Sequence, residues 1–483
     1  MLDKLIAFLF AIGVIAIPFD AIPGVKALGE LSNEASFYSF ALAMGLYGFK
    51  VAGASLVGGD RAPLGAALVW RTGAVAVAVI FVSALWNAAD ISVARFHDRA
   101  GSLKLATSAS VVTYGVVLAS LTCVTVPGRW YRCLVLPICI SAALCIGFGA
   151  LEVLDRAGVS VPVYSALNAA LHAGSDHDVQ PWNSVLNLKL VEGWDKRLRT
   201  VSFEPPAFGN FAGMAWPWLL CAVLMTRKSR RALHIILLIA FTILIVGSQA
   251  RTGSLLLAAD LVSFGLLWFV FLPREGRVNK PAALITGSVL FLTITSIVLV
   301  YAASFDEIVS GVVSGTSVSD LSRLAYQVTA LKLFSVNPIV GVGLGQFAFK
   351  AASSMPSWGF LSPEIRSSLV YPEAPWPNIY SLYARLAAEL GIMGLLGWVA
   401  IWSAFMISVC RAALRYAGFG RTVPAIVYPI IMGCVAVLVA SVTTDTFRTP
   451  MIWITLGAGA CFTARSKQLS RERSRDLQPG AKY

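Results

Sequence analysis

The sequence predicts an all-α, polytopic integral membrane protein with about twelve transmembrane helices. Of its 483 residues, 57% are hydrophobic and only 13% are charged. A water-soluble chain of this length needs more charge to cover its surface, so the predicted solvent is lipid. Apolar segments of about 15–25 residues recur along the chain. Each is long enough to cross a bilayer core of roughly 30 Å as a helix.

These segments are predicted to be helices because backbone groups in lipid must be satisfied within the segment, and the lengths do not suit barrel strands. They are centred near residues 10, 43, 79, 115, 143, 216, 240, 263, 293, 399, 434 and 458. The first resembles a signal peptide, but it lacks a small-x-small cleavage site, and IPFDAIPG follows it. We therefore expect it to be retained, within a single membrane domain at 1–483.

Lysine and arginine indicate the orientation. The short loops GRWYR (128–132), TRKSRR (226–231), PREGRVNK (273–280) and CRAALRYAGFGR (410–421) are basic, and so is the tail at 466–483. The positive-inside rule places them, with both termini, in the cytoplasm. The net charge of +13 is then mostly a topology signal. We expect no nucleic-acid binding, because the tail has no interleaved aromatic residues.

Two long segments are then predicted to be extracytoplasmic. The first spans 152–206, and the larger spans 305–378, between helices nine and ten. None of the eight cysteines lies in them, so no disulfide framework is expected. The single Asp-x-Asp in SDHD (175–178) is too weak a signal for a metal site. The cytoplasmic loops are too short for a nucleotide-binding domain, so we expect any chemistry at the outer face, without metal or cofactor.

The turn GSQARTG (247–253) separates two predicted helices and carries Arg251. An arginine at membrane depth usually faces a cavity or a partner. Its guanidinium binds phosphate oxygens in a bidentate way, and the following helix begins near Thr252, where free N–H groups favour an anion. Ser248 and Thr252 add hydroxyl donors. The alternative is an interfacial arginine that extends to water.

The larger outer segment contains a predicted helix that starts near Ser319 or Asp320 and ends at Asn337-Pro338. It is too short to span the bilayer, so we expect it to lie at the interface or to pack over the bundle. Arg323 lies in its first turn, where a cation is poorly placed for the helix dipole. This position indicates an anionic partner, which is either a ligand or Asp320 at i−3. GVGLG (341–345) is predicted to be a loop with exposed backbone.

Three blocks occur in the order GSQARTGSLLL (247–257), SRLAYQVTALKLFSVNPIVGVGLGQF (322–347) and YSLYARLAAELGIMG (380–394). They resemble the signature blocks of the O-antigen ligase/polymerase superfamily, bacterial inner-membrane glycosyltransferases whose donor is a glycan on undecaprenyl pyrophosphate. The resemblance covers roughly residues 200–400. It implies that Arg251 and Arg323 clamp the donor's pyrophosphate at a periplasmic active face, where charge develops on the leaving group.

One departure from that family affects the mechanism. The histidine-asparagine pair of its ligases falls here on Tyr380 and Ser381 when the Glu-x-Gly motif is aligned without a gap. An unperturbed tyrosine is a poor base at neutral pH. Glu204 precedes an apolar helix, where desolvation could raise its pKa, although it could also be a solvated loop acid. Glu389 follows Arg385 by one turn and either acts in catalysis or forms an intrahelical ion pair.

The block RTVSFEPPAFGNF (199–211) resembles the Ser-Glu-Pro region of polymerase members. With the absent histidine, it favours a repeat-unit polymerase that transfers glycan from undecaprenyl pyrophosphate to a lipid-linked acceptor. One alternative is an O-antigen ligase, whose acceptor is the lipopolysaccharide core. The other is a secondary transporter, although the two halves of the chain show none of the similarity that transporters usually have. Membrane lipids are the remaining expected partner.

Overall fold

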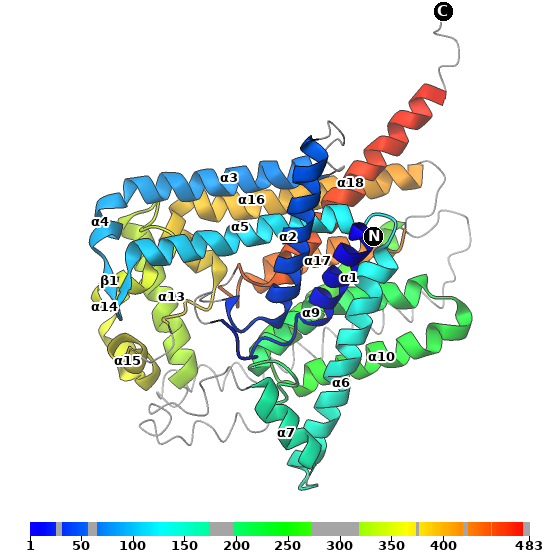
Figure 1. The fold of residues 1–483 in the computed structure, drawn as a ribbon. Helices are drawn as coiled ribbons and strands as arrows, with labels where there is room; N and C mark the ends of the chain where they lie inside the picture. Colours follow the sequence, from blue (N-terminus) through cyan, green and yellow to red (C-terminus); the bar gives the residue numbers. More distant parts are fainter. Residues whose placement is uncertain are drawn as a thin grey trace, which may run out of the picture.

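Helices form almost the whole of the described chain in a computed structural model (Figure 1). The structure describes residues 1–25, 31–56, 65–159, 161–172, 197–271, 318–372, 376–418, 424–445 and 447–476. Within these ranges there are sixteen α-helices and one antiparallel pair of two-residue strands, β1 (Arg95–Phe96) and β2 (Arg99–Ala100). The predicted all-α class is confirmed.

Six helices of the described chain are long and apolar enough to cross a membrane, which makes this a multi-pass membrane protein. They are α3 (Ala66–Trp86), α5 (Gly101–Thr125), α6 (Leu136–Arg156) with the π-helical turn Tyr131–Val135 before it, α9 (Pro205–Met225), α10 (Lys228–Gly247) and α16 (Leu382–Gly418). Five further helices lie at predicted centres: α1 (Leu2–Ile15), α2 (Ala35–Leu56), α11 (Arg251–Phe271), α17 (Val427–Ala440) and α18 (Pro450–Asp476). The helix predicted near residue 293 and the loop 273–280 lie outside the described residues.

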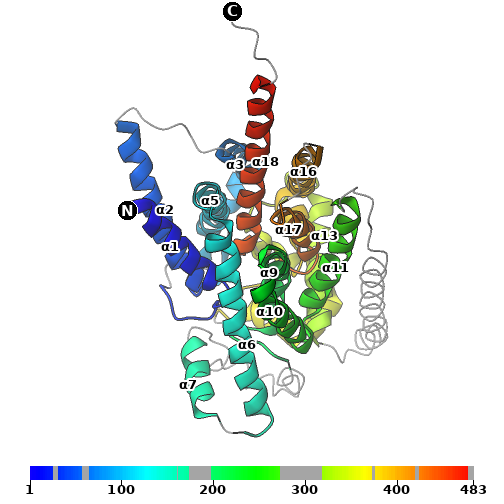
Figure 2. The same cartoon turned by 90° about the vertical axis from the view of Figure 1, so that its right-hand side faces the viewer.

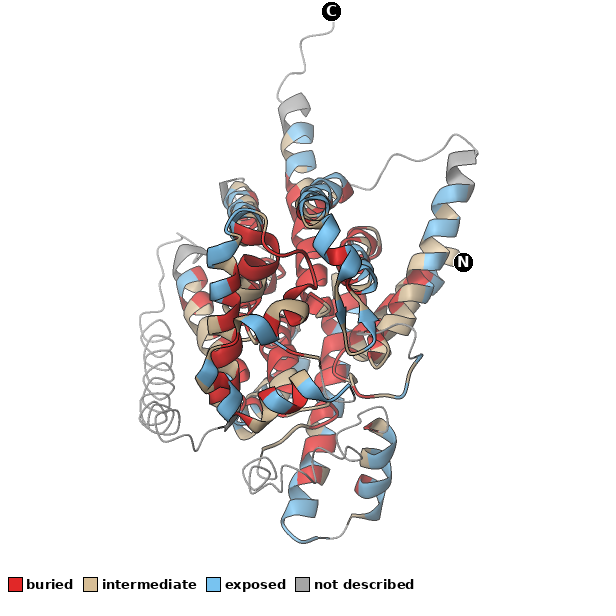
Figure 3. Ribbon diagram, turned by 90° about the vertical axis from the view of Figure 1, so that its left-hand side faces the viewer, coloured by how far each residue is buried: buried red, intermediate tan, exposed pale blue. Residues whose placement is uncertain are grey.

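Helix α9 is the centre of the bundle. It packs against α10, α11, α17 and α6, which surround it in Figure 2. In the most apolar 18-residue stretch of α9, 83% of the residues are buried, whereas the corresponding buried shares are 17% for α3 and 22% for α10. Buried residues therefore concentrate around α9, and the outward faces of the peripheral helices are exposed (Figure 3). Those exposed faces are apolar, as expected for helices whose solvent is lipid.

The described part of the segment predicted to be the larger extracytoplasmic one, from residue 318 onward, folds as a small helical layer at one end of the bundle. Its helices are α13 (Val318–Val336), α14 (Phe347–Ser354) and α15 (Pro363–Val370), with a 3₁₀ turn at Ser357–Leu361. They share a second apolar core that includes Tyr326, Phe347, Ile365 and Ile379. The single interfacial helix predicted within 305–378 is thus α13, and it packs on α14, α15 and α16. In the other segment predicted to be extracytoplasmic, 152–206, α6 extends to Arg156 and α7 (Pro162–Leu171) follows.

The prediction of exposed backbone at GVGLG is wrong, because residues 341–345 are all buried. Helix α16 is kinked at Gly391, with φ 65° and ψ −159°, and the loop fills that kink. The amides of Val342 and Gly343 donate to the carbonyls of Ala388 and Glu389, both at 2.9 Å. A Cβ on Gly341, which has φ +67°, would lie 2.4 Å from the Glu389 carbonyl carbon. Glycine is needed there because two backbones touch.

The first part of the basic tail predicted at 466–483 is helical, because α18 continues to Asp476. Its polar end projects from the bundle (Figure 1). Gln468 Nε2 donates to Glu472 Oε1 at 3.0 Å, a spacing that stabilises an exposed helix. Local side-chain pairs therefore extend the helix beyond the apolar span.

Candidate functional site

The turn between α10 and α11 is closed by its own hydroxyls. Ser248 Oγ donates to the Ile245 carbonyl at 2.7 Å and accepts from the Ala250 amide at 3.3 Å. Thr252 Oγ1 donates to Thr443 Oγ1 at 3.0 Å. Ser248 and Thr252 are both buried. These two predicted pyrophosphate ligands therefore hold the turn in place, and Arg251 is left on its surface with 42% of its side chain exposed.

Asp320 joins the two arginines that the sequence singled out. Arg251 Nη1 and Nη2 donate to Asp320 Oδ1 and Oδ2 at 2.6 and 3.1 Å. Arg323 Nη1 lies 4.0 Å from Asp320 Oδ1, and its guanidinium carbon lies 5.3 Å from the centre of the Tyr380 ring. The contacts of Asp320 thus bring the first turn of α13 to the start of α11, and two guanidinium groups share one carboxylate.

A third arginine, Arg197, adjoins this pair. The Leu198 amide donates to the Gly247 carbonyl at 3.4 Å, which places residues 197–198 along the turn that carries Arg251. Burial, and then the charges of Arg251 and Arg323, hold the pKa of Arg197 below its ordinary value. We call Arg197, Arg251, Arg323 and Asp320 the arginine cluster. Sequence reasoning missed Arg197, although DKRLR (195–199) is a basic run in a segment predicted to be extracytoplasmic, where the positive-inside rule disfavours one.

Glu204 lies at the edge of the arginine cluster. It is the N-cap residue of α9, and Pro205 occupies the first helical position. Burial raises its pKa to about 7 despite the opposing charge of Arg323, and the Asp20 carboxylate raises it further. The expectation of a desolvated Glu204 agrees with this environment. A carboxyl group that titrates near neutral pH beside cations has the properties of a general base.

The N-terminal segment supplies two acids that sequence reasoning also missed. Asp20 Oδ1 accepts from the Phe203 amide at 2.6 Å, next to Glu204. Glu34 is buried and pairs with Arg448, Nε to Oε1, at 3.2 Å. Burial and the neighbouring Glu34 raise the pKa of Asp20. The only sequence signal was an acid between prolines in IPFDAIPG, and nothing local linked it to Glu204.

Tyr380 and Ser381 are engaged in structural contacts. The Tyr380 hydroxyl donates to Glu364 Oε1 at 2.8 Å, and burial raises its pKa well above the ordinary value. Ser381 Oγ accepts from the Ala384 amide at 3.4 Å at the start of α16. Tyr380 is therefore a neutral donor, and its ring supports Arg323. Neither side chain has the geometry of a base that replaces the family histidine.

Glu389 forms the intrahelical ion pair that was its alternative interpretation. Arg385 Nε lies 3.1 Å from Glu389 Oε2, with 11% and 3% of the two side chains exposed. Arg385 also donates to the Asp445 carbonyl at 2.7 Å. The pair thus stabilises α16 and its contact with the α17–α18 connection.

Strained backbone is concentrated around the cluster. Among the described residues, five non-glycine residues have positive φ, and three of them are Thr200 (55°), Gln249 (48°) and Tyr380 (59°). Thr200 and Gln249 lie within three residues of Arg197 and Arg251, and the ring of Tyr380 contacts the Arg323 guanidinium. Such conformations cost on the order of 1–3 kcal/mol each and cluster at functional sites. The two segments that carry Arg197 and Arg251, and the one that places Tyr380 against Arg323, are therefore held in place by the surrounding fold.

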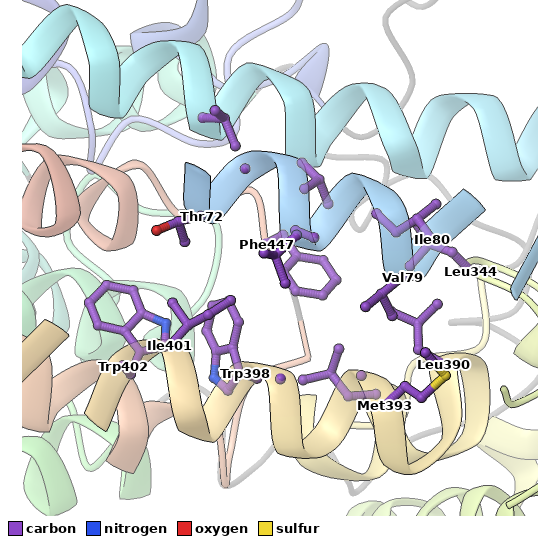
Figure 4. A pocket seen from close by; sticks show the side chains of 18 of the residues that line it. Thr72, Val79, Ile80, Leu344, Leu390, Met393, Trp398, Ile401, Trp402 and Phe447 are labelled. Carbon is purple, nitrogen blue, oxygen red and sulfur yellow. The ribbon is translucent and has the colours of Figure 1, made fainter. Parts of the chain in front are cut away.

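An apolar pocket lies between α3 and α16, also lined by α5 and α18 (Figure 4). The side chains of Ile80, Leu390, Trp398 and Phe447 face its interior. None of its described lining residues is charged. Phe447 also contacts the Arg385 guanidinium, at 5.7 Å from the ring centre. The pocket is therefore suited to a hydrocarbon chain, and one of its walls continues directly into Arg448.

Residues 235–399 match the family model described as O-Antigen ligase. The matched range includes Arg251, Asp320, Arg323 and Tyr380, and it leaves out Arg197, Glu204, Asp20, Glu34 and Arg448. A comparison with curated proteins found no match. Within the described residues, no group of three or more His, Cys, Asp or Glu side chains could hold a metal ion, and SDHD (175–178) lies outside them.

Proposed function

We propose that this multi-pass membrane protein, which carries an O-antigen ligase family domain at residues 235–399, is a polysaccharide repeat-unit polymerase. Members of that family are enzymes that transfer glycans from lipid-linked substrates. The proposed reaction moves a glycan from undecaprenyl pyrophosphate to a lipid-linked acceptor repeat unit, at the periplasmic face of a bacterial inner membrane, without metal.

The observation that carries this proposal is the position of Glu204 beside the arginine cluster. Burial raises the pKa of Glu204 to about 7, and the charge of Arg323 acts on the same carboxyl group. A hydroxyl of the acceptor sugar attacks the anomeric carbon of the donor, and its proton passes to the Glu204 carboxylate. The bond from the anomeric carbon to the pyrophosphate oxygen breaks, and its electron pair leaves with lipid pyrophosphate. Arg251 and Arg323 stabilise the charge that develops there.

We prefer the polymerase activity to the ligase activity because the proposed base, Glu204, lies at the start of α9. Tyr380 and Ser381, at the positions of the ligase histidine and asparagine, are engaged with Glu364 and the α16 backbone. Glu204 belongs to the block at 199–211, which resembles polymerase members. The base therefore comes from the start of α9 in this proposal.

The apolar pocket supports a lipid-linked donor. An isoprenoid chain needs apolar surface at membrane depth, and the pocket between α3 and α16 is lined almost wholly by apolar side chains. Its wall at Phe447 is followed directly by Arg448, which is paired with Glu34 and whose charge also acts on the Glu204 carboxyl group. An isoprenoid chain bound in this pocket would thus place the polar head group of the donor toward these charged residues.

The test is deletion of the gene, followed by a gel of surface glycans and extraction of lipid-linked intermediates. Lipopolysaccharide core that carries a single repeat, without a ladder, is the result expected of a polymerase. Bare core with long glycan retained on the lipid carrier would establish the ligase alternative. Complementation with Glu204→Gln should fail to restore the ladder, whereas the control Asp90→Asn, in an exposed pair with Lys350, should restore it. An unchanged profile after deletion would contradict both transferase activities on O-antigen.

A further inference from the structure

We propose that Arg197 is a third cation for the donor's pyrophosphate, held in position by Glu152 and Arg156 of α6. This inference rests on the proposed function, and it adds a residue outside the matched range 235–399. The third positive charge would also make the site bind a lipid pyrophosphate more tightly than a lipid monophosphate.

Backbone contacts place Arg197 at the cluster. The Leu198 amide donates to the Gly247 carbonyl at 3.4 Å. A Cβ on Gly247 would lie 3.0 Å from Leu198 Cδ1, so the two segments are packed together. Arg251 begins the helix that follows this turn. The charges of Arg251, Arg323 and Asp320 all act on Arg197, so the four groups share one electrostatic environment.

The charge balance of the cluster indicates an anionic ligand. The four members of the cluster, three guanidinium groups and the Asp320 carboxylate, together carry a net charge of +2, and the Glu204 carboxyl group lies at their edge. A pyrophosphate diester with both phosphoryl groups ionised carries the opposite charge. Among the described residues, Arg323 Nε is buried and has no hydrogen-bond partner, and a buried unsatisfied donor is costly. A phosphoryl oxygen would satisfy it.

Like charges at close range repel one another, so the chain must hold Arg197 there. Glu152 is fully buried, and its carboxylate accepts from the amides of Thr200 at 2.9 Å and Arg199 at 3.3 Å. Arg156 Nη2 bridges from Glu152 Oε1 at 2.5 Å to the Arg197 carbonyl at 2.7 Å. We call Glu152 and Arg156 the α6 anchor. It fixes the backbone from 197 to 200, including the left-handed Thr200.

The experiment measures binding to the purified full-length chain in lipid nanodiscs. The probes are undecaprenyl pyrophosphate and undecaprenyl monophosphate. Arg197→Ala should weaken pyrophosphate binding about tenfold, the order expected for a charged hydrogen bond, and monophosphate binding less than threefold. Arg197→Lys should recover part of the affinity. The matched control is Arg199→Ala, because Arg199 Nη2 donates to Asn168 Oδ1 at 3.2 Å, on α7.

The anchor is tested by Arg156→Ala, which removes the bond to the Arg197 carbonyl and leaves the backbone bonds of Glu152. It should weaken pyrophosphate binding, and it should add little to Arg197→Ala in the double variant. Unchanged affinity in folded Arg156→Ala would overturn the role of the anchor.

The outcomes of these binding experiments also distinguish failure of this inference from failure of the proposed function. A wild-type chain that does not bind undecaprenyl pyrophosphate overturns the proposed function. A wild-type chain that binds it, with equal affinity in Arg197→Ala, overturns the third cation alone. Equal losses for both probes would assign Arg197 a general attraction to anions and remove the proposed specificity. The melting temperature of each variant identifies loss of binding that comes from unfolding.

Discussion

Asp320 and Arg251 form a bidentate ion pair between two helices, with Nη–Oδ distances of 2.6 and 3.1 Å. Only 11% of the Asp320 side chain is exposed, and Arg323 lies within 4.0 Å of the same oxygen, Oδ1. The carboxylate therefore occupies guanidinium donors that an incoming phosphoryl group would also use. Under the proposed function, donor binding would loosen this pair, and product release would restore it.

Asp320→Asn should tighten binding of undecaprenyl pyrophosphate and slow turnover, because the product anion then has no competing carboxylate. The affinity should rise roughly fivefold, equivalent to about 1 kcal/mol. The measurement is the dissociation constant in nanodiscs, together with the steady-state rate. Asp90→Asn, which breaks the exposed pair with Lys350, is the control. Weaker binding in Asp320→Asn would show instead that Asp320 mainly positions Arg251.

The Glu204 carboxyl group sets the expected pH dependence of the transfer rate. Its pKa is raised to about 7, first by burial, and a base acts only in its ionised form. The transfer rate should therefore be low under acidic conditions, rise as the pH increases through about 7, and stay level above that. Asp20→Asn keeps an acceptor for the Phe203 amide but removes a like charge, so the midpoint should move to lower pH. Glu204→Gln should lower the turnover number about 100-fold or more.

Initial rates between about pH 5.5 and 8.5 test these shifts against the Glu204 pKa of about 7. A profile that keeps its midpoint in Asp20→Asn would separate the N-terminal acids from catalysis. A Glu204→Gln variant that retains the wild-type rate would exclude Glu204 as the base.

The ring of Tyr380 should contribute more to donor binding than its hydroxyl contributes to the transfer rate. Tyr380→Phe keeps the contact with Arg323, 5.3 Å from the guanidinium carbon to the ring centre, and loses the donation to Glu364. We expect donor affinity near wild type and a rate reduced less than tenfold. Tyr380→Ala also loses a cation–π contact of about 0.5–1 kcal/mol, so donor affinity should fall a few-fold. A Phe variant with no activity would indicate that the hydroxyl takes part in the chemistry.

Gly397 allows the apolar pocket to be filled. It lines the pocket on α16, and a Cβ added there would meet nothing within 4 Å. Gly397→Leu should raise the Michaelis constant for the undecaprenyl-linked donor several-fold, while a donor with a short isoprenoid chain is used as before. Gly147→Leu, at a helix position with equally open space, is the matched control. Equal kinetics with both donors would place the lipid chain elsewhere.

The Arg385–Glu389 pair should matter for stability. Glu389→Gln leaves a nearly buried arginine without its carboxylate, at a cost of about 3 kcal/mol. Asp3→Asn, which breaks an exposed pair with Lys50, should cost less than about 1 kcal/mol. Thermal unfolding in detergent compares the two variants. If Glu389→Gln unfolds like wild type while its transfer rate falls sharply, the pair has a catalytic role.

The helices could be located from the sequence, because immersion in lipid requires long apolar segments with internally satisfied backbone. Every predicted centre within the described residues lies in a helix. Local spacing was also enough for Glu389 and Arg385, one turn apart, and for Asp320 as a partner of Arg323. The short polar turn at 247–253, between two apolar segments, was sufficient to single out Arg251.

Other features depended on contacts that no local pattern encodes. GVGLG is buried because α16 is kinked to receive it, and Ser248 and Thr252 are used within the fold. Arg197, Asp20 and Arg448 reach the site from three distant segments. The pKa of Glu204 follows from that convergence, since burial and several charges act on one carboxyl group. Helix formation in lipid is a local matter of hydrogen bonding, whereas a charged site is made by packing, which brings together residues that are far apart along the chain.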